Sequence, residues 1–390
     1  MTAKTKKTEE IRALAGARAF PPLMIVLFHF SEGHHYSGLP WLDLAVTRGY
    51  LWVEFFFVLS GFILTHVYGA RLAQLFSRPG YRDFLRARLI RLYPLHLAVL
   101  LILAAQVALV RAMAHAGGYG SLYDIVYHPD MSLKGFVLSV LMVQAWNTLN
   151  DLTWNGASWF VSVEFALCLL FPLFIWLAHG KTWRGFALVA AGLGGVLLLD
   201  LTSKHGLDIT FHNGVLRGLS DFSVGVGLAV LFRSVRNLSI PAPVHSGLQL
   251  ILLVLLGLAV YHTGWSHTRM DIFTVLPIMA LVFALAFDKG LLAEALKTRL
   301  PQRLGVWSYA IYMGQTVWLQ AIRVFEQRLY PAPDTLVLGT RFSTLIWWLE
   351  PTLLVLVCIA WGALLATWIE HPAAAFLKRR LDRSVPATPS

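Results

Sequence analysis

The feature that most limits how this chain can fold is a series of apolar stretches that recurs along nearly its whole length. A helix needs about 20 largely apolar residues to cross a bilayer. The stretches that approach or exceed this length are approximately 19–36, 50–68, 92–113, 158–178, 184–200, 214–233, 247–263, 271–287, 304–322 and 344–368. The sequence therefore predicts an all-α, polytopic membrane protein with about ten transmembrane helices.

The charged residues are few, and they are grouped. Only 14% of the 390 residues are charged and 57% are hydrophobic, whereas soluble domains carry about 25% charged residues. The net charge of +11 does not indicate nucleic-acid binding, because the basic residues lie in short clusters between the apolar stretches. We therefore expect the lipid bilayer, and no nucleic acid, among the partners of this protein.

The positions of lysine and arginine predict the orientation of the chain. With ten spans and a cytoplasmic N-terminus, 23 of the 32 basic residues fall on the cytoplasmic side, where the positive-inside rule places them. A further apolar segment, 134–148, is shorter than a span needs to be, and counting it as one would move basic clusters to the outer side. We therefore expect 134–148 to form a re-entrant or interfacial helix and both termini to be cytoplasmic.

The chain is expected to hold one membrane domain, residues 18–377, between a cytoplasmic segment 1–17 and a short cytoplasmic tail 378–390. Cys168 and Cys358 both lie in apolar stretches, which favours packing over a disulfide. No metal site is expected.

The first apolar stretch, RAFPPLMIVLFHF, contains a histidine, His29, where a membrane helix ordinarily has none. A charged side chain inside a bilayer costs about 2.5–3.5 kcal/mol on insertion scales, so such a residue is a functional candidate. Arg18 begins the same stretch, and Pro21 and Pro22 follow it. Because proline fits the first turn of a helix but not its middle, Arg18 either shares a helix with His29 or lies in a separate segment before a break.

Arginines recur at helical spacing between the second and third apolar stretches. Arg82, Arg86, Arg88 and Arg91 alternate there with apolar residues. One interpretation is an amphipathic helix attracted to anionic lipid. The other is a phosphate-binding site, because one guanidinium group can donate two parallel hydrogen bonds to the oxygens of a phosphate. The charge pattern alone favours the first interpretation.

Acidic side chains interrupt two apolar stretches near their predicted outer ends. Glu54 lies in the second stretch, and Glu164 follows Trp159 and Ser162 in the fourth. A carboxylate inside a membrane usually has a partner or faces a cavity. Taken alone, Trp159 suits an aromatic belt at the membrane surface, and Ser60–Gly61 suits close packing between helices.

A polar stripe runs along the ninth stretch. Ser308, Tyr312 and Gln315 are spaced i, i+4 and i+7, so they share one helix face, and Tyr309 is adjacent. The stripe predicts either a hydrogen-bonded bundle core or a substrate-binding surface.

Six motifs in this order resemble acyltransferase family 3, membrane enzymes that O-acylate cell-surface sugars and related acceptors with acetyl-CoA or another acyl-CoA. The matching residues are Arg18 with His29; Glu54 before FFFVLSGFIL; Arg88, Arg91 and Pro94; Trp159, Ser162 and Glu164; SYAIYMGQ at 308–315; and Glu370 with Pro372. The resemblance extends from about Glu10 to Leu377. The chain differs from many members in three places: Gln315 replaces a histidine, Glu54 replaces an aspartate, and the Pro21–Pro22 pair is unusual.

The resemblance implies a donor site at the cytoplasmic face and a bacterial inner-membrane location. The residues expected to hold the phosphates of acyl-CoA are Arg18, Arg86, Arg88 and Arg91. The thioester would reach toward His29. His29 would act as general base or as a transient acyl carrier, while Glu54 and Glu164 would orient the acceptor. The residues expected to bind substrate are Trp159, Ser162, Ser308, Tyr309, Tyr312 and Gln315.

The implied reaction transfers an acyl group, most simply acetyl, to a hydroxyl of a sugar or polysaccharide on the outer side of the membrane. The alternative is a transporter or flippase for a glycan precursor, because charged residues inside helices also mark transport sites. Against this alternative, the sequence shows no pair of matching halves with interrupted helices.

Overall fold

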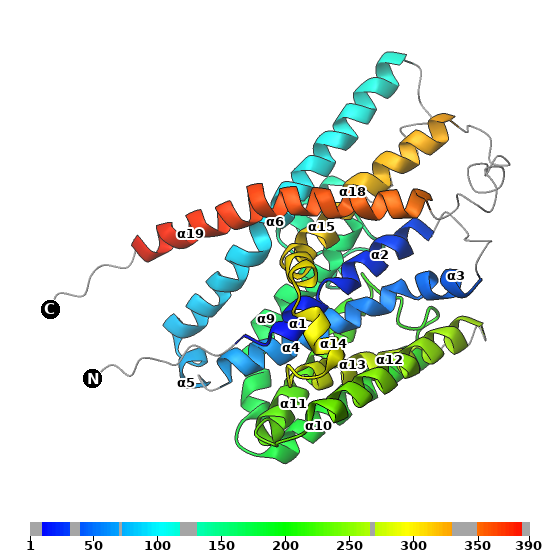
Figure 1. Ribbon diagram of the computed structural model, residues 1–390. Helices are drawn as coiled ribbons and strands as arrows, with labels where there is room; N and C mark the ends of the chain where they lie inside the picture. The colour runs from blue at the N-terminus through cyan, green and yellow to red at the C-terminus, as the bar shows by residue number, and fades with distance from the viewer. Residues whose placement is uncertain are drawn as a thin grey trace.

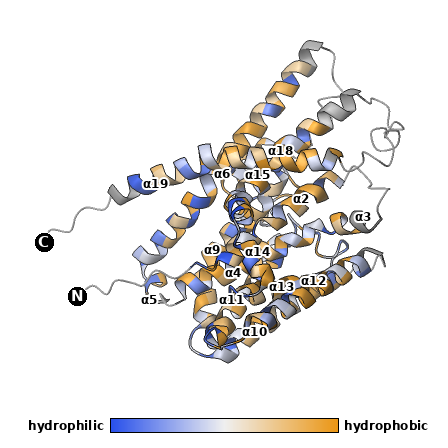
Figure 2. Cartoon of the chain, in the orientation of Figure 1, coloured by the Kyte–Doolittle hydropathy of each residue, from blue (hydrophilic) through white to orange (hydrophobic). Residues whose placement is uncertain are grey.

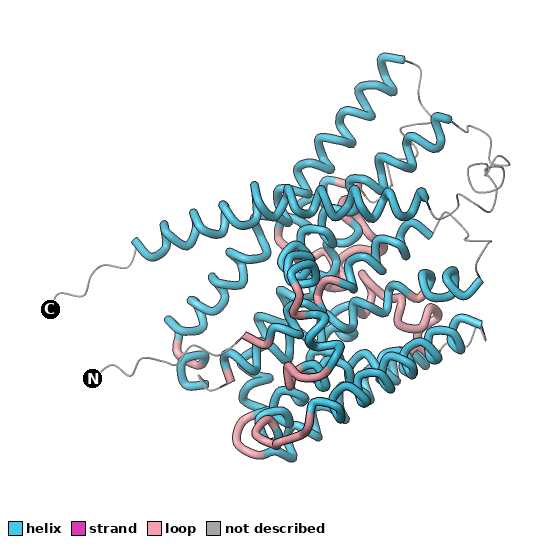
Figure 3. Tube along the Cα trace, viewed as in Figure 1, coloured by secondary structure: helices cyan, strands magenta, loops and turns pink. Residues whose placement is uncertain are grey.

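The fold was obtained as a computed structural model, which describes residues 10–31, 40–69, 72–117, 131–265, 270–329 and 349–383. Within these ranges the chain forms helices joined by turns and loops, with no strand (Figure 3). The sequence prediction of an all-α membrane protein is therefore confirmed.

The helices pack side by side in a bundle (Figure 1). Their bounds are α1 Arg12–Ala17, α2 Phe20–Ser31, α3 Pro40–Thr47, η1 Gly49–Leu51, α4 Trp52–Tyr68, α5 Leu72–Leu75, α6 Arg78–Gly117, α8 Leu133–Val140, η2 Gly156–Ser158, α9 Trp159–Ala178, α10 Thr182–Thr202, α11 Gly214–Val235, α12 Ala242–Trp265, α13 Ile272–Leu285, α14 Leu291–Leu296, α15 Arg299–Leu329, α18 Leu349–Leu365, η3 Ala366–Glu370 and α19 His371–Arg383.

Eight of the ten predicted apolar stretches coincide with helices that are long and apolar enough to cross a membrane, counted over the described residues. The other two, 271–287 and 304–322, also form helices. The first is α13, which is apolar but has only 14 residues. The second lies within α15, whose 31 residues are more polar. Every predicted stretch is thus helical in its described part.

The first apolar stretch is divided at Arg18, which ends α1 as its C-cap. The chain turns through Arg18 and Ala19, and α2 starts at Phe20. Pro21 and Pro22 therefore lie in the first turn of α2, where a missing backbone N–H leaves no hydrogen bond unmade. Of the two alternatives that the prolines left open, the separate segment is the one observed.

Segment 134–148 begins with a short helix and does not span. Helix α8 has 8 residues, which corresponds to about 12 Å at 1.5 Å per residue. The chain beyond it is irregular and partly buried, with Met142, Gln144 and Ala145 inside the protein, and the Ala145 amide donates to Ser162 Oγ at 3.1 Å. His96 of α6 is hydrogen-bonded to the Ser139 carbonyl at 2.7 Å. Non-helical backbone at membrane depth needs such partners.

The polar residues of α6 and α19 lie at one end of the bundle (Figure 2). The arginines of the first turns of α6 and the basic residues 378–380 of α19 gather there, and the two helices contact one another. This is the arrangement that the predicted topology requires of two cytoplasmic basic clusters.

Helices α4, α10 and α11 pack closely through small residues. A Cβ added to Gly61 of α4 would overlap the Phe222 carbonyl oxygen of α11. In α10, a Cβ added to Gly192 would overlap the Ser220 carbonyl oxygen of α11, whereas one added to Gly194 would meet nothing within 4 Å. Small residues let helix backbones approach in membranes, where lipid supplies no hydrophobic drive for association.

We therefore expect Gly192→Ala to destabilise the protein by about 1–3 kcal/mol, because the two backbones must move apart. Gly194→Ala, in the same helix, is the matched control and should be neutral or slightly stabilising, since alanine is the better helix former. Thermal unfolding of the two purified variants in detergent measures the difference. Equal midpoints would show that α10 and α11 are not packed this closely.

Candidate functional site

A cavity of about 140 Å³ lies inside the bundle, among helices that are distant in the sequence. Its walls come from the α1–α2 break and from α4, α6, α9 and α15. The lining residues are Arg18, Phe56, Leu59, Ser60, Ile63, Leu64, Arg88, Arg91, Leu92, Phe160, Glu164, Ser308, Tyr309 and Tyr312. The cavity thus brings together 7 of the 13 residues that the sequence singled out for donor binding, catalysis or substrate binding.

Three arginines line this cavity: Arg18, Arg88 and Arg91. Arg18 and Arg88 are half-buried, and Arg91 is exposed. Within the described ranges, none of the three has a carboxylate within the 4.0 Å of an ion pair. Three positive charges without a direct counter-ion favour the binding of an anion, and guanidinium groups suit phosphate in particular.

Glu164 and Ser60 form a pair on the opposing wall. The Ser60 hydroxyl donates a short hydrogen bond to Glu164 Oε1, which joins α4 to α9. Glu164 Oε2 is buried and has no hydrogen-bond partner in the described part of the chain. The carboxylate also interacts electrostatically with Arg88, Arg91 and Arg18. One oxygen is therefore held in place, and the other can accept a hydrogen bond from a bound molecule.

The tyrosines of α15 close the cavity on a third side. Tyr309 Oη donates to the Leu92 carbonyl at 2.7 Å, which fixes α15 against α6 beside the arginines. The Tyr312 ring packs edge-on against Phe160, with ring centroids 5.6 Å apart. Ser308 Oγ donates to the Gly305 carbonyl of its own helix at 2.8 Å. The predicted polar stripe is thus partly bundle core and partly cavity wall.

His29 lies in the last turn of α2 and does not line this cavity. It is half-buried, and its ring centroid is 5.1 Å from that of Phe28. Phe28 in turn packs against Tyr50 before the start of α4, at 5.5 Å. The cavity begins further along α4, at Phe56. His29 and the arginines therefore occupy different depths of the bundle.

Glu54 is paired, and it also lies outside the cavity. Arg217 of α11 donates from Nε to Glu54 Oε1 at 2.7 Å, and the two side chains are 1% and 0% exposed. The Arg217 guanidinium lies 5.2 Å from the centre of the Trp159 ring. Asp221, a further fully buried carboxylate on α11, interacts electrostatically with both members of the pair. These four residues form a second charged cluster, separate from the first.

The remaining predicted residues also lie away from the cavity. Arg86 is half-buried, lies 3.7 Å from Asp83 and does not line the cavity. Ser162 accepts the Ala145 amide and so holds the irregular segment after α8. Gln315 is fully buried and donates to the Tyr312 carbonyl at 3.0 Å.

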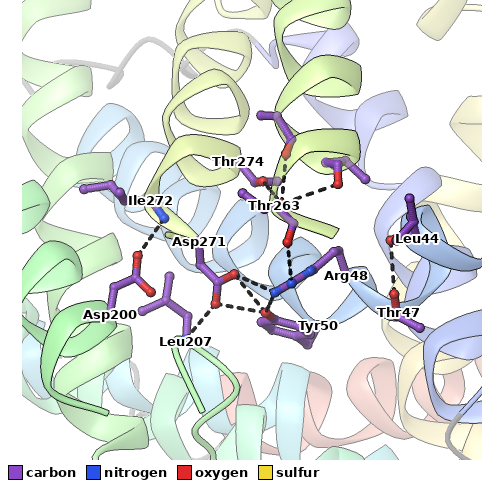
Figure 4. A network of polar contacts seen from close by, with 12 residues as sticks. Leu44, Thr47, Arg48, Tyr50, Asp200, Leu207, Thr263, Asp271, Ile272 and Thr274 are labelled. Atoms are coloured by element: carbon purple, nitrogen blue, oxygen red, sulfur yellow. Dashed lines mark hydrogen bonds and ion pairs between the residues drawn. The ribbon is translucent and has the colours of Figure 1, made fainter. Parts of the chain in front are cut away.

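A hydrogen-bonded network braces the other end of the bundle (Figure 4). Arg48 donates to Asp271 at 3.0 Å and to the Thr263 carbonyl at 2.7 Å. Tyr50 and the Leu207 amide donate to the same Asp271 carboxylate. The start of α4 lies at this end of the bundle, whereas the cavity arginines lie near the C-terminal end of α4. The network joins η1 and its N-cap Arg48 to α12 and to the N-cap of α13.

The sequence interpretation missed two partners in these sites. Ser60 was attributed to helix packing, although its neighbour Gly61 alone fulfils that role. Arg217 is one of the nine basic residues outside the predicted cytoplasmic clusters, and its position inside an apolar stretch was the available signal. An intramembrane carboxylate calls for an intramembrane cation, and Arg217 is the one that Glu54 meets.

Comparison with known proteins shows the family to which the chain belongs. The profile of the acyltransferase domain family Acyl_transf_3 matches residues 11–369. The chain is 27% identical to the acyltransferase MdmB of Streptomyces mycarofaciens, over 94% of this chain and 92% of that protein. It is 35% identical to protein 2 in the picA locus of Rhizobium radiobacter, over 30% of this chain and 59% of that protein. No solved structure matches. The chain is therefore a membrane acyltransferase that belongs to acyltransferase family 3.

Proposed function

We propose that this enzyme transfers an acyl group, most simply acetyl, from cytoplasmic acyl-CoA to a hydroxyl of a sugar or polysaccharide outside the bacterial inner membrane. The observation that carries the proposal is the cavity in which Arg18, Arg88 and Arg91 face Glu164. Acyl-CoA combines phosphates, which suit the arginines, with a thioester, which can be attacked by a hydroxyl.

The reaction needs a base, a leaving group and a path between the two sides of the membrane. The acceptor oxygen bonds to the thioester carbonyl carbon, the C–S bond breaks, and the CoA thiolate leaves. In this direct route His29 takes the proton of the acceptor hydroxyl. In the alternative route a ring nitrogen of His29 first displaces the CoA thiolate from the carbonyl carbon, and the acceptor oxygen then displaces the imidazole from the acyl group. The depth of His29, away from the arginines, supports a role nearer to the acceptor than to the CoA phosphates.

The carboxylates take different parts in this scheme. Glu164, with one oxygen free of hydrogen bonds, orients the acceptor hydroxyl or the histidine. Glu54 acts through Arg217, holding α4 against α11 beside Trp159. The remaining residues proposed to shape the acceptor site are Ser162, Ser308, Tyr309, Tyr312 and Gln315.

Replacing Arg88 or Arg91 by alanine should raise the KM for acetyl-CoA about 10- to 150-fold, since a hydrogen bond to a charged group contributes about 1.5–3 kcal/mol. Arg86→Ala is the matched control: it removes an arginine from the same helix but outside the cavity, and should change the KM less than about threefold. The measurement is the initial rate of thiol release from acetyl-CoA by purified protein in nanodiscs with acceptor present. Equal effects of all three substitutions on the KM for acetyl-CoA would show that this cavity does not bind the donor.

The same assay separates the enzyme from a transporter or flippase. A transporter moves its cargo without breaking the thioester, so purified protein would release no CoA thiol. Mass spectrometry of surface glycans from cells with and without the protein then identifies the acceptor and the acyl group, as a mass difference equal to one acyl group.

A further inference from the structure

A second cavity opens next to the first, where α4 ends and α6 begins. Its volume is about 370 Å³, within the range of about 300–1,000 Å³ that is typical of small-molecule pockets. Its lining residues are Tyr68, Gln74, Leu75, Ser77, Gly80, Asp83 and Phe84. The sequence analysis assigned no role to any of them, and the proposed acyl transfer does not yet use this space.

Arg88 connects the two cavities. It lines the first cavity, and its guanidinium carbon lies 5.9 Å from the centre of the Tyr68 ring and 5.8 Å from that of Phe84. Both rings line the second cavity. A molecule with a negative charge on Arg88 could therefore extend from that point into either cavity.

The two helices present matching faces to such a molecule. On α6, Phe84, Arg88 and Arg91 are spaced i, i+4 and i+7, so they share one face. On α4, Ser60 of the first cavity and Tyr68 of the second are eight residues apart, about 12 Å along the helix and again on one face. The Tyr68 and Phe84 rings meet edge-on, 5.2 Å apart, and join the two faces. The cavities thus follow one track between α4 and α6.

The lining of the second cavity differs in kind from that of the first. Among the described residues that line it there is no lysine or arginine, and they combine an aromatic ring, the amide of Gln74 and the carboxylate of Asp83. The Ser77 hydroxyl already has hydrogen-bond partners within the protein, because it donates to the Gln74 carbonyl and accepts from the Gly80 amide. An aromatic ring stacks on a nucleobase, an amide both donates and accepts, and a carboxylate accepts from amino or hydroxyl groups. These groups suit a purine nucleoside and not a phosphate.

We propose that the second cavity binds the adenosine end of the acyl-CoA donor. The phosphates then lie at Arg88 and Arg91, and the pantetheine arm carries the thioester into the first cavity, toward Glu164. This order of groups along the track, nucleoside, phosphates and acyl thioester, is the order in which they are joined in acyl-CoA. The inference rests on the proposed function, and it explains why a donor with a nucleotide would be preferred to an acyl thioester without one.

The test compares two donors, acetyl-CoA and acetyl-pantetheine, which carries the same thioester without phosphates or nucleoside. Tyr68→Ala should raise the KM for acetyl-CoA about 5- to 150-fold, the equivalent of losing one base-stacking contact. The same substitution should leave the KM for acetyl-pantetheine unchanged. Gln74→Ala, at an exposed position, should show the same donor dependence with a smaller effect. Phe76→Ala is the control, since this 58% exposed ring lines neither cavity.

Adenosine 3′,5′-bisphosphate provides a second measurement that needs no turnover by the variant. It should compete with acetyl-CoA in the parent enzyme and compete at least fivefold less well in Tyr68→Ala. The inference is overturned if Tyr68→Ala changes the KM for both donors equally, because the two donors share only the thioester end, which does not enter the second cavity. It is also overturned if neither KM changes. A parent enzyme that releases thiol from neither donor would instead overturn the proposed function itself.

Discussion

Replacing His29 by alanine should lower the rate of acyl transfer by about 10²–10⁴-fold, because that is the usual contribution of a general base. The protein should fold normally, since His29 lies near the end of α2 and is only half-buried. The measurement is kcat for acyl transfer to the acceptor, with expression and thermal midpoint recorded for each variant. The KM for acyl-CoA should change little, because His29 does not line the arginine cavity.

His66→Ala is the control for this experiment. His66 also lies in a membrane helix, where its ring stacks on Phe62, and it lines neither cavity. Its loss should leave kcat within about threefold of the parent, as expected for a substitution outside the reaction. If His29→Ala, at normal abundance, acylates at near the parent rate, the assignment of His29 is wrong. Rapid-quench mass spectrometry then separates the two routes, because only a transient carrier adds an acyl mass to the peptide that contains His29.

Replacing Arg217 by methionine should destabilise the protein by about 3–5 kcal/mol, the cost of leaving the other partner of a buried ion pair uncompensated. The effect should be large here because Glu54 loses its charged partner while Asp221 remains buried beside it. Arg217 also donates to the carbonyls of Ile209 and Tyr50, both at 3.0 Å. Thermal unfolding of the purified variant in detergent, with ligand absent, measures the loss.

A double substitution distinguishes charge from packing in this cluster. If the ion pair dominates, Glu54→Gln in the Arg217→Met background should restore part of the lost stability, because the buried charge is removed. Glu54→Gln alone should cost less than Arg217→Met. If the two losses simply add, the residues do not interact energetically, and the cluster contributes by packing alone.

Much of the fold could be predicted because a bilayer permits few solutions. Apolar stretches of spanning length must become helices there, since every backbone polar group needs an internal partner. Pro21 and Pro22 left open whether Arg18 shares a helix with His29, and the structure shows the separate segment, with both prolines in the first turn of α2. The short segment 134–148 was separated from the predicted spans by its length and by the charges around it, and its only helix, α8, has 8 residues.

The candidate site was predicted less completely, because a sequence lists charged residues without saying which ones meet. Glu54 and Glu164 have the same signature, a carboxylate in an apolar stretch. Only the packing of α4 against α11 gives Glu54 a buried partner in Arg217, 163 positions away. Only the approach of α4 to α9 leaves Glu164 in a cavity with Ser60.

The arginines show the same division between sequence and structure. Their recurrence identified a basic face, and that face had two interpretations, lipid or phosphate. The helix rotation decides between individual residues: Arg88 and Arg91 line the cavity, and Arg86 lies beside Asp83 outside it. The sequence by itself determined the helices, the membrane class and the family, because hydropathy and motif order are local properties of the chain. Only the tertiary structure decided which charges share a cavity and which are paired, because those pairings depend on how helices far apart in the sequence pack.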